Sequence, residues 1–174
     1  MHISILYHHN CPDGLAAAFA CWQRFKDSAQ YLPVMYGQPC PEIPADHQVY
    51  IVDFSYDAET LVRLHHHHVA HGGDVTVIDH HASAQRDLIS LSRTKRPGLT
   101  ILFNMQESGA TLTWKYLRMG GWAPQYDPEQ DGLEYSMPIF FKYVRDRDLW
   151  RWALPDSKAI SMAYWALDKA MPSI

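Results

Sequence analysis

Apolar and polar positions along the chain follow two patterns, one typical of strands and one typical of helices. Short β-branched or aromatic runs indicate strands at residues 2–7 (HISILY), 48–52 (QVYIV), 74–78 (DVTVI) and 100–103. Longer runs with helical character follow at residues 15–25, 58–70 and 110–119. Strands that alternate with helices are usually joined by crossovers, which place the strands side by side and parallel. The pattern therefore predicts an α/β fold in which helices flank a parallel sheet on both faces.

The pattern changes after Gly121, because no strong strand signal remains. Residues 138–144 (PIFFKYV) and 159–170 are predicted to be helical, which makes the C-terminal third helical. The length of 174 residues suits one domain, and neither a repeat nor a low-complexity linker divides the chain. We expect residues 1–174 to form a single domain.

Composition and charge narrow the classes of function. The net charge is -4, which argues against a protein that holds nucleic acid mainly through a broad basic surface. The apolar runs are far shorter than the roughly 20 residues of a membrane span, so no membrane association is expected. The three cysteines, Cys11, Cys21 and Cys40, show no disulfide or zinc-knuckle spacing. This usage fits a reducing compartment, and a cytoplasmic location is expected.

Residues that commonly bind metals gather where three predicted strands end. The first strand leads to His9, Cys11 and Asp13, the second ends at Asp53, and another ends at residues 79–81 (DHH). Ligands bind beyond the carboxyl ends of the strands in open parallel sheets. Imidazole and carboxylate groups that converge there suit one or two divalent first-row metals, and such sites catalyse phosphoryl chemistry. Any one of these residues could instead be a turn or cap residue, but three such strand ends favour a site.

Four segments resemble the motifs of the DHH phosphoesterases. Residues 77–83 (VIDHHAS) resemble the signature that gives the superfamily its name, and residues 9–18 (HNCPDGLAAA) resemble its first motif. Residues 52–56 (VDFSY) and 143–150 (YVRDRDLW) resemble the second and fourth motifs. Because the motifs occur in family order from Met1 to about Trp150, they are more specific together than the DHH triplet alone.

The resemblance implies a role for each matching residue. Asp53 would bridge two metal ions, with His9 and Cys11 on one side. Asp13, His80 and Asp146 would lie on the other side, with Asp148 as the alternative to Asp146 because the Asp-Arg repeat leaves the match ambiguous. Asp79 would orient His80 or join the metal, and His81 would face the substrate phosphate. Arg145 and Arg147 are candidates for phosphate binding, or equally are charged residues at a surface helix end.

Two departures from the family pattern affect these expectations. Cys11 stands where most members have Asp, and manganese remains the expected ion. The softer thiol could instead favour zinc or iron, leave the first site weak, or mark a subfamily in which the cysteine is not a ligand. Family members also typically carry a further C-terminal domain that binds substrate, and residues 1–174 have no room for it. The expected partners are therefore a small phosphorylated substrate and a lid supplied by a second copy in a homodimer or by a partner chain.

The resemblance implies a hydrolase that cleaves a phosphodiester or phosphoanhydride bond of a nucleotide, a short oligonucleotide or a pyrophosphate-like molecule. A metal-bridged water would attack the phosphorus. The alternative is a degenerate DHH domain that binds a nucleotide or a partner protein without catalysis, which the change at Cys11 and the absent second domain both favour.

Other conspicuous residues are interpreted as structural. Residues 65–68, four consecutive histidines, cover every side of a predicted helix and are assigned to a partly exposed face without function. Ser108 either caps a helix or helps its N-terminus bind phosphate. Five tryptophans are expected to pack in the core rather than stack on bases: Trp114, Trp122, Trp150, Trp152 and Trp165.

Overall fold

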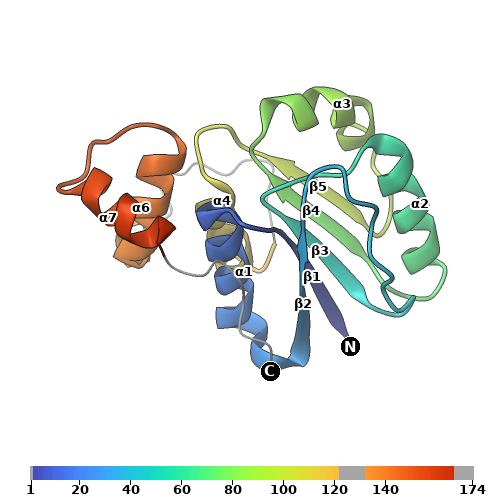
Figure 1. Ribbon diagram of the computed structural model, residues 1–174. Coiled ribbons are helices and arrows are strands. Elements are labelled where there is room, and N and C mark those ends of the chain that lie inside the picture. Colours follow the sequence, from blue (N-terminus) through green and yellow to red (C-terminus); the bar gives the residue numbers. More distant parts are fainter. Residues whose placement is uncertain (1, 122–131, 167–174) are drawn as a thin grey trace.

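A five-stranded parallel sheet with helices on both faces forms the body of the protein (Figure 1). The computed structural model describes residues 2–121 and 132–166. The strands are β1 (Ile3–His8), β2 (Ala29–Val34), β3 (Gln48–Val52), β4 (Val75–Asp79) and β5 (Leu99–Phe103). The helices are α1 (Pro12–Phe25), α2 (Ala58–Val69), α3 (Ala82–Ser92), α4 (Gly109–Arg118), α5 (Leu133–Ser136), α6 (Ile139–Asp148) and α7 (Ser157–Trp165), with a 3-10 turn at Lys26–Ser28. The α/β class and the helical C-terminal part agree with the sequence prediction.

The strand order is β2-β1-β3-β4-β5, and each neighbouring pair is parallel. The chain passes from β1 to the edge strand β2 and returns to β3 on the other side of β1. Loops that leave the carboxyl ends of β1 and β3 therefore turn toward opposite faces, which opens a crevice between these two strand ends. The topology places the carboxyl ends of the neighbouring strands β1, β3 and β4 side by side.

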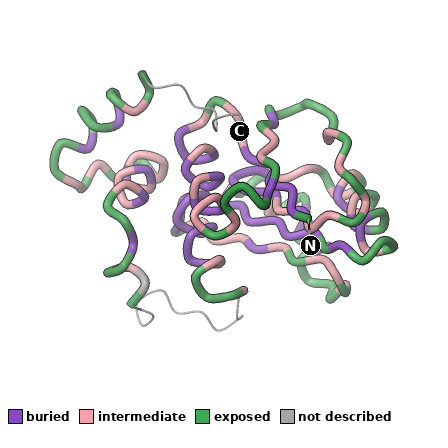
Figure 2. The backbone as a smooth tube through the Cα atoms, turned by 90° about the horizontal axis from the view of Figure 1, so that it is seen from below, coloured by how far each residue is buried: buried purple, intermediate pink, exposed green. Residues whose placement is uncertain are grey.

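The two faces of the sheet form two hydrophobic cores. Helices α1 and α4 cover one face, where Ile5 and Tyr7 are fully buried, and α2 and α3 cover the other, where Leu6 and Ile51 are fully buried (Figure 1). The alternation along β1 follows from the two-residue period of strand side chains. Buried residues concentrate in the strands and in the helices against them (Figure 2).

Strand β2 and the helices α3 and α5 are absent from the sequence prediction. Strand β2 is a sheet edge that contains Pro33, and proline is tolerated there because an edge strand leaves backbone N–H groups unpaired. Helix α3 buries only Leu88 and Leu91, so its apolar stripe is too narrow to stand out in the sequence. Predicted helix 159–170 is observed as α7 up to Trp165, and residues 167–170 lie outside the described residues.

The tryptophans divide between the core and the surface. Trp114 is buried as predicted, but Trp150 is 74% exposed and Trp165 is 41% exposed, so the core prediction is wrong for these two. Trp150 follows the end of α6 with a positive φ of 56°, which turns its side chain out of the packed interior. Trp122 lies outside the described residues.

The histidine run follows the helical period. His65 and His68 are buried on the inner side of α2, where His65 Nε2 contacts the Pro97 carbonyl at 2.8 Å and His68 Nδ1 contacts the Ala45 carbonyl at 3.0 Å. His66 and His67 are exposed. His65 and His68 therefore hold α2 against the rest of the fold, and His66 and His67 face solvent.

A buried network of charges ties α6 to α4. Lys115 Nζ in α4 lies 2.7 Å from Glu107 Oε1 in the loop before α4. Arg145 in α6 contacts the second oxygen of Glu107 at 3.1 Å and Glu134 at 2.6 Å. Lys115 is 1% exposed and Glu107 is 4% exposed. Breaking such a network would leave a buried charge without its partner, so it holds α6 in a defined place against α4.

Among residues 2–121 and 132–166, no helix is both long enough and apolar enough to span a bilayer.

Removal of the buried Lys115 charge is expected to destabilise the fold. Lys115→Met should lower the free energy of unfolding by about 3–5 kcal/mol, because Glu107 stays buried without its nearest cation. Lys142→Met is the matched control, since Lys142 is 23% exposed and its Nζ lies 3.9 Å from Glu134. The control should lose less than about 1 kcal/mol. Urea unfolding measures both, and equal losses would contradict a buried network that depends on Lys115.

Candidate metal centre

Seven side chains meet at the carboxyl edge of the sheet. They come from the end of β1, the start of α1, the residues after β3 and β4, and the end of α6. We call them the strand-end cluster: His8, Cys11, Asp13, Asp53, His80, His81 and Asp148. Three overlapping sets of three among them place one potential ligand atom from each residue within 4.8 Å of the others.

Asp53 belongs to two of these sets and lies at the centre of the cluster. It follows β3 directly, and its backbone N–H donates to the Ile78 carbonyl of β4 at 3.0 Å. Its φ of 63° is in the left-handed region, which aspartate tolerates better than most residues. This turn ends the strand and directs the carboxylate into the crevice, where Asp53 is only 1% exposed.

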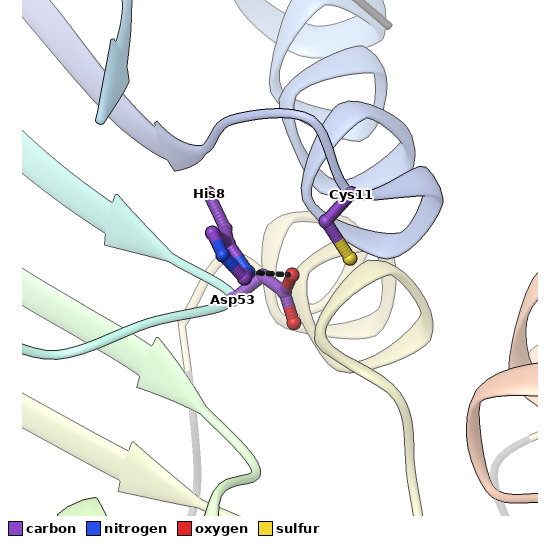
Figure 3. A group of neighbouring side chains, drawn as sticks. All are labelled: His8, Cys11 and Asp53. Carbon is purple, nitrogen blue, oxygen red and sulfur yellow. Dashed lines mark ion pairs between the residues drawn. The ribbon is translucent and has the colours of Figure 1, made fainter. Parts of the chain in front are cut away.

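His8, Cys11 and Asp53 form the first set (Figure 3). His8 Nδ1 lies 3.6 Å from Asp53 Oδ2. Figure 3 shows the Asp53 carboxylate between the His8 ring and the Cys11 thiol, which come from the end of β1 and the start of α1. An imidazole, a thiol and a carboxylate form a donor set that suits zinc or iron as well as manganese.

The structure places His8 in this set, whereas His9, the residue predicted from the sequence, belongs to none of the three sets found among the described residues. Strand β1 runs through His8, one residue beyond the predicted strand, so His8 is the residue that reaches the crevice. The His9 backbone N–H instead donates to the Val34 carbonyl at 2.8 Å, next to the sheet edge. Because successive strand side chains point to opposite faces, a shift of one residue exchanges the two imidazoles.

Asp13, His80 and Asp148 form another set. His80 Nε2 lies 3.4 Å from Asp13 Oδ2, 3.5 Å from Asp148 Oδ2 and 3.2 Å from Asp53 Oδ1. His80 therefore links this set to the central carboxylate. Both sets offer three protein ligands, and catalytic sites commonly use three and leave further coordination positions open.

Asp148 occupies the place that the sequence prediction gave to Asp146. Asp146 accepts hydrogen bonds from the backbone N–H groups of Ala153 and Leu154, at 2.9 and 3.3 Å, and from the Ser157 hydroxyl at 2.5 Å. Residues two apart on a helix point in different directions. Asp146 therefore fixes the turn into α7, while Asp148 faces His80.

Asp79 binds the ring of the second histidine of the DHH triplet and the backbone of both histidines. Its Oδ1 accepts from His81 Nδ1 at 2.7 Å, and its Oδ2 accepts from the Ser55 hydroxyl at 2.6 Å. Oδ1 also accepts from the His80 and His81 backbone N–H groups at 2.7 and 3.1 Å. Asp79 belongs to none of the three-residue sets found among the described residues, and it binds His80 through the backbone N–H, so its predicted role in orienting His80 or joining the metal stays a prediction.

The N-terminus of α4 binds Asp13 and is therefore occupied. The Gly109 and Ala110 N–H groups donate to the two Asp13 oxygens at 2.6 and 3.0 Å. Ser108 forms a capping box with Thr111, which agrees with the capping alternative for Ser108. A carboxylate at a helix N-terminus is stabilised by the helix dipole. This helix end thus fixes a side chain of the cluster.

Two glycines allow the close approach of the backbone to the cluster. A Cβ atom at Gly109 would lie 2.4 Å from Asp53 Oδ1, and one at Gly14 would lie 2.1 Å from the His8 carbonyl oxygen. Both distances are far inside van der Waals contact. Gly109 and Gly14 therefore let α4 and α1 pack directly against the residues of the cluster.

The crowding of carboxylates shifts the pKa values of the cluster. Burial, together with the charges of Asp53 and Asp148, raises the pKa of Asp13 well above its usual value. Burial also acts to raise the pKa of Asp53, but the close imidazoles of His8 and His80 outweigh it and hold this pKa low. Burial and the Asp53 charge raise the pKa of Cys11 to about 12. A divalent cation would oppose the shifts at Asp13 and Cys11, because it favours the ionised form of both groups.

Unpartnered atoms in the cluster fit a bound cation. Within the described residues, five buried atoms that face the crevice have no hydrogen-bond partner: His8 Nδ1, Asp53 Oδ1, Asp53 Oδ2, His80 Nε2 and Asp148 Oδ2. Buried polar atoms are normally satisfied. Imidazole nitrogens and carboxylate oxygens together suit a divalent first-row metal, so the donor set and the unpartnered atoms agree.

The two arginines predicted to bind phosphate are engaged elsewhere. Arg145 lies in the buried network with Glu107 and Glu134, so its guanidinium is not directed to the cluster and that prediction is corrected. The Arg147 guanidinium lies 4.7 Å from the centre of the Trp165 ring, a cation–π contact between α6 and α7. Neither contact points to phosphate binding.

Comparison with known proteins adds evidence on the fold. No protein-family model matches the chain, and no curated protein matches it in sequence. The crystal structure of an uncharacterized protein from Helicobacter pylori G27 is similar, with a TM-score of 0.63 and 14% sequence identity. The similarity covers 87% of this chain and 44% of that chain, so the present chain spans less than half of its length. At this identity the similarity shows a shared fold alone.

Paired substitutions on α6 distinguish a metal ligand from a structural carboxylate. Asp148→Asn should weaken manganese or zinc binding at least roughly tenfold, since even residues that only support ligands change affinity by that much. Asp146→Asn should leave metal affinity within about twofold but lower the free energy of unfolding by about 1–3 kcal/mol, because it weakens the acceptor of the turn into α7. Titration calorimetry and urea unfolding measure the two effects. The reverse pattern would restore Asp146 as the ligand.

Proposed function

We propose that this protein is a metal-dependent phosphoesterase of the DHH type, which hydrolyses a phosphodiester or phosphoanhydride bond of a nucleotide or short oligonucleotide. The observation that carries the proposal is the geometry around Asp53, a buried carboxylate that belongs to one set with His8 and Cys11 and to another with His80 and His81. His80 in turn connects it to the set with Asp13 and Asp148. The four sequence motifs supply most of the residues of these sets, which supports the resemblance independently of the metal.

Two divalent ions in the cluster would activate a water molecule and neutralise charge on the phosphate. Manganese is the expected ion, and zinc and iron are the alternatives because Cys11 is a softer ligand than a carboxylate. The first ion would be held by His8, Cys11 and Asp53, and the second by Asp13, His80 and Asp148 together with the shared Asp53. The ligand atoms are buried between the sheet and α6, which limits the access of bulk water.

His81 is suited to donate a proton to the leaving oxygen. It is 36% exposed at the mouth of the cluster, and Asp79 holds its Nδ1, which leaves Nε2 as the free ring nitrogen. The hydrogen bond to Asp79 raises the pKa of His81, although burial opposes the shift. A raised pKa keeps the imidazolium populated nearer neutral pH, as a general acid requires. Asp79 and Ser55 act as positioning residues that fix the ring.

One observation favours a second candidate, a domain that binds a nucleotide or a partner protein without catalysis. Cys11 binds a metal only as thiolate, and burial and the Asp53 charge raise its pKa, so an ion in the first set must displace a proton that a carboxylate ligand would not carry. Loss of one of two ions would impair hydrolysis more than binding, because both ions neutralise charge that develops during the reaction.

Replacement of the shared carboxylate tests the proposal. With manganese present, Asp53→Asn should reduce hydrolysis to the background level across dinucleotides, short oligonucleotides, pyrophosphate and a chromogenic phosphodiester. The variant removes the carboxylate charge that belongs to the set with His8 and Cys11 and that lies 3.2 Å from His80 Nε2. Asp87→Asn makes the same chemical change at an exposed position of α3 and should retain full activity.

The panel also separates the two candidates. If the unmodified protein, loaded with manganese or zinc, cleaved none of these compounds, hydrolysis would be rejected in favour of the binding domain. Activity in the unmodified protein that persists in Asp53→Asn would reject the strand-end cluster as its source.

A further inference from the structure

A pocket of about 570 Å³ adjoins the strand-end cluster on the side of α2. It is open to solvent and is lined by residues 35–40, which follow β2, by residues 54–57, which follow β3, and by Thr60 and Arg63 of α2. Small-molecule sites commonly measure roughly 300–1,000 Å³. Residues 54–56 of its lining belong to the second sequence motif, but residues 35–40, Thr60 and Arg63 belong to none of the four motifs, so the pocket extends beyond the predicted site.

Tyr36 joins the pocket to the cluster. Its ring lines the pocket, and the same ring lies edge-on to His8, with centroids 4.6 Å apart, and to His81, with centroids 6.0 Å apart. Ser55 also lines the pocket and donates to Asp79, which holds His81. A molecule in the pocket would therefore lie next to the place where the cluster would bind a phosphate.

The lining of the pocket suits a flat, polar ring. Tyr36, Phe54 and Tyr56 supply three aromatic rings, and the Phe54 ring meets the other two edge-on at 6.5 and 5.2 Å. Tyr36 is 56% exposed, so one of its faces remains accessible. Aromatic side chains bind nucleobases by stacking, and this contact tolerates different bases.

Polar groups on the far side of the pocket add hydrogen-bonding capacity. Arg63 pairs with Glu59 at 3.9 Å, but both side chains are well exposed, so the pair is weak and the guanidinium can turn to a ligand. The Gln38 oxygen accepts from the Met35 N–H at 3.1 Å, which orients the amide within the loop. Amide and guanidinium donors match the ring nitrogens and carbonyls of a nucleobase.

We propose that this pocket is the subsite for the nucleobase of a nucleotide whose phosphate lies at the strand-end cluster. The inference rests on the proposed function for the placement of the phosphate, while the pocket itself is defined by the residues above. It assigns specificity to the β2–β3 connection and α2, and it makes Tyr36 the residue that both supports the base and packs against His8 and His81.

Titration calorimetry of the manganese-loaded protein tests the proposal with four nucleoside 5′-monophosphates and with ribose 5-phosphate, which lacks a base. At least one nucleotide should bind roughly tenfold or more tightly than ribose 5-phosphate, the effect expected of one stacked base. Thr60→Trp should abolish this preference by filling the pocket from α2. Thr100→Trp places the same side chain in a pocket at the amino ends of the strands and should leave the preference unchanged.

A second pair of variants separates the ring of Tyr36 from its hydroxyl. Tyr36→Phe should keep the preference for a base, and Tyr36→Leu should lose most of it. The proposal would be overturned if all five compounds bound equally, or if Thr60→Trp left the preference intact. Hydrolysis without any preference for a base would reject this subsite alone. A preference for a base without hydrolysis would reject the proposed activity and leave the subsite in place.

Discussion

The concentration of negative charge around Asp53 is the constraint on which the rest of the structure depends. Three carboxylates, Asp13, Asp53 and Asp148, surround one imidazole, His80, at distances of 3.2–3.5 Å from its Nε2. Carboxylates in a buried crevice repel one another and lose hydration, so they must share protons or a cation. The raised pKa of Asp13 and the low pKa of Asp53 show how unequally these costs fall on neighbouring groups.

Several elements of the fold position these carboxylates and compensate their charge. The sheet order brings the ends of β1, β3 and β4 together, and the positive φ of Asp53 turns its carboxylate inward. The N-terminus of α4 compensates Asp13 with two backbone N–H groups, and Gly109 permits that approach.

The C-terminal helices position the third carboxylate, Asp148. Arg145 anchors α6 to the Glu107–Lys115 pair of α4, three residues before Asp148. Asp146 fixes the turn that follows α6. An interaction far from the sheet thus sets the position of one potential metal ligand.

The sequence predicted the fold class and most of the cluster because the signals were local. Strands showed as short β-branched runs, and Asp53 and His80 stood directly at their ends. The prediction failed where it had to choose between residues one or two positions apart, because the choice depended on the direction in which each side chain points. His8 is the last residue of β1 and His9 is the first residue after it, and Asp146 and Asp148 differ in their angle around α6. No composition or motif distinguishes such neighbours, because the answer depends on where the strand ends and how the helix packs.

Other features depended on contacts between distant segments and left no local signal. Arg145 looked like a phosphate ligand next to an acidic motif, but Glu107 and Glu134 bind it after α5 and α6 fold against α4. The pocket beside Tyr36 requires the β2–β3 connection, whose edge strand was not predicted. Trp150 was assigned to the core by residue type, although its place after α6 exposes it.

The central claim is that Asp53 is shared by two metal ions. Anomalous scattering from crystals grown with manganese tests it most directly, because it locates the ions without reference to activity. We predict two peaks roughly 3.5–4 Å apart on either side of the Asp53 carboxylate, one beside His8 and Cys11 and the other beside His80 and Asp148. A crystal with manganese peaks only at exposed groups, such as His66 and His67, and none at Asp53 would contradict the account.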